Sequence, residues 1–207
     1  MEGMRIAFIR TGNEAGINRH ILALLKHFKS SGAEVREFEL REENAQEVVN
    51  NLLEFSPFFS MDINGMGIIV GQQEEKRVPI CDIFGFVHVS VFTDEPLLYS
   101  IGLFGMREAN NFLPVVCDLK YADSRRFLGI NRGVFYITPF IDREAMIEPS
   151  GEKDWEVVFL GSVIDPQLVA NQVVSNLKES FVPFFFEVGD FLFRNPEVHV
   201  LVASEYI

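Results

Sequence analysis

Two carboxylates that follow an apolar strand are the clearest candidates for chemistry in this sequence. The run Phe86 to Phe92 (FVHVSVF) is typical of a strand, and Thr93-Asp94-Glu95-Pro96 follows it directly. Ligands of open parallel sheets bind outside the carboxyl ends of the strands, where a carboxylate can act as a general base. Asp94 and Glu95 are the two candidate bases, and because adjacent residues leaving a strand project to opposite sides, only one of them can readily serve the site. The alternative is a solvated turn in which Asp94 is a cap.

A second loop of interest is Thr11-Gly12-Asn13-Glu14-Ala15-Gly16, which follows the apolar run Arg5 to Ile9. Its glycines would let the backbone approach a ligand, and the N-terminus of the helix that follows would favour anions or sugar hydroxyls. Gly12 and Asn13 are therefore candidate ligand-binding residues. The spacing G-x-G-x-x-G is absent, so the loop does not match a dinucleotide-binding fingerprint. A simple strand-to-helix turn is the other interpretation.

Two further loops end in residues that could contact a ligand. Asn64-Gly65-Met66-Gly67 follows the predicted strand Phe59 to Ile63, and the Asn64 amide could line a pocket or the pair could form only a turn. Gly161 and Ser162 follow a predicted strand from Glu156 to Leu160, and they are candidates for contact with a phosphate.

The sequence offers no pattern for a metal site or for nucleophilic catalysis. Cys81 and Cys117 are far apart with no CxxC motif, which predicts two reduced thiols. The four histidines lack a metal-ligand spacing, and we interpret them, His88 among them, as structural or surface residues. A G-x-S-x-G elbow and a phosphate-binding P-loop are also absent from the sequence.

Composition limits the partners. The formal net charge is −12, whereas binding to nucleic acid or to an anionic membrane needs clustered Lys and Arg. Asp94 and Glu95 interrupt the longest apolar stretch, so no segment is predicted to span a membrane. The start of the chain has no recognisable secretion signal, and we expect a cytoplasmic protein.

These loops must be positioned by alternating strands and helices. Strands are predicted at Arg5 to Ile9, Glu34 to Leu40, Phe59 to Ile63, Phe86 to Phe92, Leu113 to Cys117 and Gly133 to Ile137, with helices from Ile17, from Asn44 to Phe55 and over Ala122 to Leu128. The polar stretch Gln72 to Arg77 is predicted to be a surface loop. The pattern indicates an α/β fold, in which a doubly wound parallel sheet of about six strands is covered by helices on both faces.

Domain organisation is predicted from a change in composition. Residues 1 to 145 form one domain, and Asp142 to Asp154 reads as a polar linker. Residues 154 to 207 contain a strand and two helical segments, at Gln167 to Ser180 and Phe184 to Phe193. They are predicted to be the incomplete start of a second α/β domain, or an extension of the first with exposed apolar surface.

At the joint between these parts the sequence resembles GT-B-type glycosyltransferases. Ile137-Thr138-Pro139-Phe140-Ile141-Asp142 is similar to the turn that closes the N-terminal Rossmann-like domain of that family, and Val157-Val158-Phe159-Leu160-Gly161-Ser162 to the strand that opens the second. PFFSMDINGMG, from Pro57 to Gly67, and VSVFTDEP, from Val89 to Pro96, resemble the CgeB-like, glycosyltransferase family 4-like branch.

The resemblance implies transfer of a sugar from a nucleotide-sugar donor to an acceptor, with no cofactor and no metal. It implies that residues 1 to 145 are the acceptor side, that the donor site lies mainly in the C-terminal domain, and that this fragment is inactive alone. Asp94 matches the place from which several such enzymes supply a base, so the resemblance makes Asp94 the candidate base and Glu95 the runner-up. The alternatives are a flavodoxin-like flavin-binding module, because Thr11-Gly12-Asn13 is similar to a flavin phosphate loop, and a non-catalytic sugar-binding or partner-binding domain.

Overall fold

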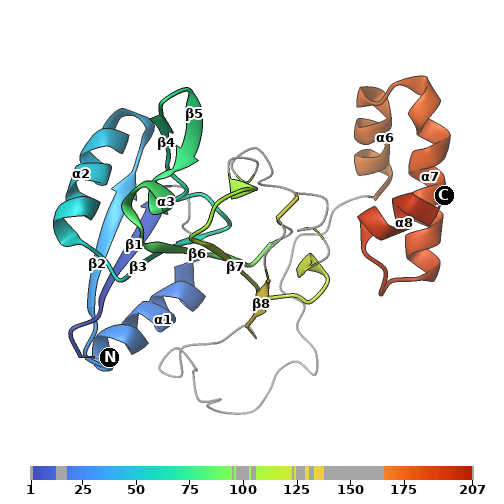
Figure 1. Ribbon diagram of the computed structural model, residues 1–207. Coiled ribbons are helices and arrows are strands. Elements are labelled where there is room, and N and C mark those ends of the chain that lie inside the picture. The colour runs from blue at the N-terminus through green and yellow to red at the C-terminus, as the bar shows by residue number, and fades with distance from the viewer. Residues whose placement is uncertain are drawn as a thin grey trace, which may run out of the picture. The chain divides into compact units, whose positions relative to one another are not determined.

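The computed structural model describes residues 2–12, 18–94, 96, 103, 106–122, 124, 129–130, 133–137 and 166–206. The chain divides into two compact units, Met1–Met146 and Ile147–Ile207. Figure 1 colours the first unit from blue to yellow and the helices of the second in orange and red. Each unit is described by itself below.

A parallel sheet of six strands forms the centre of the first unit (Figure 1). Every strand pair in it is parallel, and the order is β2-β1-β3-β6-β7-β8. The strands are β1 (Arg5–Thr11), β2 (Glu34–Leu40), β3 (Phe59–Ile63), β6 (Val87–Phe92), β7 (Phe112–Val116) and β8 (Phe135–Tyr136). This confirms the predicted Rossmann-like, doubly wound parallel sheet. The order reverses between β1 and β3, which is where open α/β sheets bind ligands.

Helices cover both faces of the sheet. Helix α1 (Asn18–Ser30) buries Ile21 and Leu25 on one face, which is called the α1 face here. Helix α2 (Ala45–Phe55) and helix α3 (Ile80–Phe84) cover the other, the α2 face. Figure 1 shows α1 and α2 on opposite sides of the strands.

The sequence explains where α2 begins and ends. Its buried residues Val48, Leu52 and Phe55 recur at helical spacing and face the sheet. A short 3-10 turn, Glu42–Asn44, leads into it, and Ser56 ends it in the left-handed region at φ 49°. Pro57 follows directly, where its ring disfavours further helix.

The predicted surface loop from Gln72 to Arg77 is wrong. These residues belong to an antiparallel hairpin of β4 (Val70–Gln73) and β5 (Lys76–Pro79), in which Gln73 pairs with Lys76. The tip of the hairpin is exposed on both sides, so it lacks the alternation of apolar and polar residues that identifies a half-buried strand.

The described part of the second unit is helical. It contains α6 (Pro166–Asn176), a 3-10 turn (Glu179–Phe181), α7 (Val182–Arg194) and α8 (Val200–Tyr206). The two helical segments predicted there are thus present, and several large apolar side chains are exposed, including Leu168, Phe181, Phe186 and Phe193. The predicted linker and the strand Glu156 to Leu160 lie outside the described residues, as does most of the predicted helix Ala122 to Leu128. Within the described residues, no helix has the length and apolar character needed to cross a bilayer.

Candidate functional site

The parallel register brings the loops after β3 and β6 together at the carboxyl edge of the sheet. Ile63, the last residue of β3, pairs with Val91. Asn64 therefore leaves β3 beside the point where β6 ends and Thr93 and Asp94 begin, and its backbone N–H donates to the Val91 carbonyl at 3.0 Å. Two loops that lie about 30 residues apart in sequence form one constellation.

Asn64 is the centre of that constellation. Its side-chain Oδ1 accepts hydrogen bonds from the Thr93 N–H at 2.9 Å, the Asp94 N–H at 3.3 Å and the Thr93 hydroxyl at 3.3 Å. Its Nδ2 donates to Asp94 Oδ2 at 3.0 Å. Asn64 is 0% exposed, whereas Asp94 is only half-buried. The buried amide thus fixes the backbone after β6 and orients the Asp94 carboxylate.

The backbone at Asn64 suits this task. Its φ is 55°, in the left-handed region that asparagine tolerates better than most residues. The turn closes with a hydrogen bond from the Met66 N–H to the Ile63 carbonyl at 3.0 Å. Met66 also reaches β1, because its sulfur accepts the Thr11 hydroxyl at 3.8 Å. The turn from Ile63 to Gly67, called the edge turn here, therefore joins the ends of three strands.

A hollow of about 300 Å³ lies at the same edge, where β1 and β2 end and α2 begins. Aliphatic side chains dominate its walls. The lining residues are Thr11, Leu40, Arg41, Glu42, Ala45, Ile68, Ile69 and Val70. Since Thr11 also contacts the edge turn, this hollow is adjacent to the Asn64 constellation, although Asp94 does not line it.

The rim of the hollow carries an ion-pair network. Arg41 binds Glu39 and Arg10 binds the same carboxylate at 3.2 Å. The hydrogen bond from Arg41 and its charge hold the pKa of Glu39 below its ordinary value, and the same bond raises the pKa of Arg41. Gly12 lies near this network, and a Cβ atom there would be 3.8 Å from Glu39 Oε1, which is ordinary contact. The structure therefore gives no steric reason for a glycine at position 12.

Polar side chains also occupy the middle of the α2 face. Ser60 and Asp62 on β3 pair in register with His88 and Ser90 on β6, and all four are buried. Ser60 Oγ and His88 Nδ1 share a hydrogen bond of 2.7 Å, and His88 Nε2 lies 3.4 Å from Asp62 Oδ2. Among the described residues, Asp62 Oδ1 and Ser90 Oγ have no hydrogen-bond partner.

The structure thus brings together two of the predicted site residues, Asn64 and Asp94. Gly12 lies at the same edge beside β2. The other predicted positions, namely Glu95, Asn13, Gly161 and Ser162, lie outside the described residues. In the part of the chain that the structure describes, no cluster of His, Cys, Asp or Glu could hold a metal ion.

Sequence reasoning missed the contribution of Ser60, Asp62 and Ser90, and it assigned His88 only a general structural role. A signal was present in both strands. FSMDI and VHVSVF alternate apolar residues with Ser, Asp or His, which indicates one apolar and one polar face. What the alternation could not show is that the two polar faces are adjacent and covered by helices.

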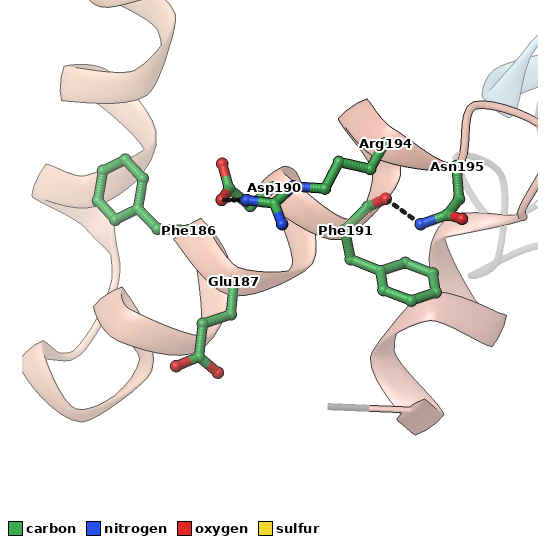
Figure 2. A pocket seen from close by; sticks show the side chains of 6 residues that line it. All are labelled: Phe186, Glu187, Asp190, Phe191, Arg194 and Asn195. Atoms are coloured by element: carbon green, nitrogen blue, oxygen red, sulfur yellow. Dashed lines mark hydrogen bonds and ion pairs between the residues drawn. The ribbon is translucent and has the colours of Figure 1, made fainter.

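The second unit carries a hollow of its own along α7. Its volume is about 600 Å³, and Figure 2 shows the side chains that line it: Phe186, Glu187, Asp190, Phe191, Arg194 and Asn195. Arg194 pairs with Asp190 at 3.0 Å, and the Asn195 amide donates to the Phe191 carbonyl at 2.8 Å. Asp190 and Arg194 are largely exposed, so their ion pair contributes little energy.

Comparison with known proteins yields one relative. The chain is 42% identical over 204 residues to a protein of Aquifex aeolicus (strain VF5) that is described as uncharacterized. The match covers 99% of this chain and 50% of the relative, so the chain spans half the length of the relative it matches. No protein-family model matches the chain, and no solved structure matches it.

Proposed function

We propose that this chain is the acceptor-side part of a GT-B-type glycosyltransferase, in which Asp94 is the general base for an acceptor hydroxyl. The observation that carries the proposal is the hydrogen bond of 3.0 Å from Asn64 Nδ2 to Asp94 Oδ2. It holds a half-buried carboxylate at the carboxyl edge of a parallel sheet, where α/β proteins bind ligands.

The arrangement suits removal of a proton from a poor nucleophile. A sugar hydroxyl attacks slowly until a positioned carboxylate takes its proton, which typically contributes 10²–10⁴-fold to the rate. Asn64 fixes both the backbone of Asp94 and one of its carboxylate oxygens, so little reorganisation is needed when the proton moves. The adjacent hollow of about 300 Å³ offers room for a part of the acceptor.

The donor belongs to another part of the protein in this proposal. A nucleotide-sugar would contact Gly161 and Ser162 at the start of the second unit, and a C-terminal domain would supply most of its site. The relative of twice the length supports this division, because it has room for a second domain of similar size.

The test is the Asp94→Asn variant of the full-length protein, with Glu95→Gln as the matched control. Release of nucleoside diphosphate from a panel of nucleotide-sugars measures turnover. We expect Asp94→Asn to lower kcat by about 10²–10⁴-fold with little change in the KM of the donor. Glu95→Gln should change kcat only a few-fold. An unchanged kcat for Asp94→Asn, with chemistry shown to be rate-limiting, would leave Asp94 a structural turn residue.

Flavin binding is the second candidate function, and the strand order favours it. The order β2-β1-β3-β6-β7 is that of flavodoxin-like sheets, which bind flavin mononucleotide where β1 and β3 diverge. Titration of the purified chain with flavin mononucleotide distinguishes the two candidates. Stoichiometric quenching of flavin fluorescence would support the flavin module, whereas no quenching at micromolar concentrations would exclude it.

A further inference from the structure

Asp62 is a carboxylate in a place where an aliphatic side chain would be expected. It is 0% exposed, is the second-last residue of β3, and faces a core that includes Leu52 and Phe92. Burying a carboxylate is costly unless it is well paired, and an apolar residue of similar size usually gives equal or greater stability. The polar partners of Asp62 are therefore the place to look for its role.

The strongest of these partners is the backbone of the edge turn. The Gly67 N–H donates to Asp62 Oδ2 at 2.6 Å. Gly67 also lies directly on the sheet. A Cβ atom at position 67 would be 2.7 Å from Asp62 Cβ and 2.9 Å from the Ile9 carbonyl oxygen. Asp62 thus holds the end of the turn at a point where its backbone lies against β1 and β3.

The edge turn connects this buried bond to the surface. Gly67 ends the turn that Asn64 begins, and the Met66 N–H closes it onto the Ile63 carbonyl. Asn64 in turn fixes Thr93 and Asp94 through four hydrogen bonds. A shift of the turn away from the sheet would move the Asn64 amide and release the backbone after β6.

We propose that Asp62 is a positioning residue for the carboxyl edge of the sheet: its bond to Gly67 sets the edge turn, and through Asn64 it sets Thr93 and Asp94. The consequence for catalysis rests on the proposed role of Asp94. Asp62 lies beneath the turn and acts on the site through two other residues.

The proposal is tested by amide hydrogen exchange of this chain, followed by nuclear magnetic resonance, in Asp62→Ala and Asp62→Asn. We expect Asp62→Ala to lower the protection of the Thr93 and Asp94 amides by about 10-fold to 100-fold, because the hydrogen bond that holds Gly67 is lost. Amides of β1 and β2 keep their protection. Asp62→Asn retains a carbonyl that can accept from Gly67 and keeps most of the protection.

Ser90→Ala is the matched control. Ser90 is equally buried, pairs in register with Asp62 and has no hydrogen-bond partner for its hydroxyl among the described residues. Its replacement should leave the Thr93 and Asp94 amides unchanged. Unchanged protection of these amides in Asp62→Ala would overturn the proposal. So would an equal loss of protection over the whole sheet, which would make Asp62 merely structural.

If Asp62→Ala does not fold, the unaltered chain still decides the matter. Under low concentrations of denaturant, the Gly67, Thr93 and Asp94 amides should open with the same free energy and the same denaturant dependence, since they move as one unit. Opening of Gly67 independently of Thr93 and Asp94 would contradict the proposal.

Exchange measurements require no turnover, so the two proposals can fail separately. If Asp94→Asn leaves kcat of the full-length protein unchanged while exchange links Asp62 to Thr93 and Asp94, the catalytic role fails and the positioning role stands. If both hold, Asp62→Ala should lower kcat more than it raises KM, and Asp62→Asn should restore most of the loss.

Discussion

The two faces of the sheet differ in a way that their equal burial hides. On the α1 face, β3 and β6 contribute Met61, Ile63 and Val91 to a core made of apolar side chains. On the α2 face, the same two strands contribute Ser60, Asp62, His88 and Ser90, all of them buried. Two neighbouring strands therefore separate two kinds of interior.

The difference indicates that the two faces have different roles. Apolar burial stabilises by about 25 cal/mol per Å², and on the α1 face β3 and β6 contribute to it through Met61, Ile63 and Val91. The α2 face gives up part of that stabilisation beneath the edge turn, because buried polar groups lose hydration that their partners replace only in part. What it gains is a set of directional contacts from the interior to Asn64 and Asp94.

The largest effect on stability is expected from a truncation in the core of the α1 face. Phe8→Ala removes a side chain that is 1% exposed, and it should lower the free energy of unfolding by about 3–5 kcal/mol. Ser90→Ala removes an equally buried atom from the α2 face and should change it by less than about 1 kcal/mol, since the hydroxyl has no hydrogen-bond partner among the described residues. Urea unfolding of both variants measures the contrast. Similar losses in both would contradict the distinction between the faces.

A smaller effect is expected where the edge turn meets the α2 face. Gly67→Ala places a Cβ atom 2.9 Å from the Ile9 carbonyl oxygen, which the backbone must move to relieve. We expect a loss of about 1–3 kcal/mol in urea unfolding. Gly12→Ala is the control, because its Cβ would meet only Glu39 Oε1 at 3.8 Å. A loss at position 12 as large as that at position 67 would show that the contact at Gly67 is unimportant.

The smallest expected effect is a difference in reactivity between the two thiols, which does not involve a change in stability at neutral pH. Cys81 belongs to the α2-face core, and burial raises its pKa to about 12; burial also raises the pKa of the half-buried Cys117, which packs against the α1-face core. A thiol reagent at pH 8 should therefore label Cys117 first and Cys81 only on unfolding.

The same pKa predicts a pH dependence. Because the pKa of Cys81 is raised above its ordinary value of 9.0, its contribution to stability is complete below pH 9 and is lost as the pH rises toward 12. Urea unfolding between pH 8 and pH 11 measures the resulting fall in the free energy of unfolding. Equal labelling of both thiols at pH 8 would contradict the buried position of Cys81.

Much of the sheet could be predicted from local sequence. Glu34–Leu40 and Phe59–Ile63 have the bounds that the sequence predicted, because a helix-ending residue, Gly32 or Pro57, comes two residues before each strand. Asn64 and Asp94 were also identifiable, since Asn64 directly follows the strand Phe59–Ile63 and Asp94 comes two residues after Phe92, the last residue of β6.

The cluster of buried polar residues on the α2 face, Ser60, Asp62, His88 and Ser90, was not predictable in the same way. Its existence depends on β3 lying next to β6 with Asp62 opposite Ser90, and register between strands that are distant in sequence has no local signal. The hairpin of β4 and β5 was missed for a related reason, because its residues are mostly exposed and carry no apolar period.

The most direct test of the account is a double-mutant cycle between Asn64 and Asp94. Urea unfolding of Asn64→Ala, Asp94→Ala and the double variant yields their interaction energy, and the strain of alanine at a φ of 55° cancels in the cycle. We predict a favourable coupling of about 1–2 kcal/mol, as expected for a hydrogen bond to a charged group. A coupling near zero would contradict the claim that Asn64 holds Asp94 at the carboxyl edge of the sheet.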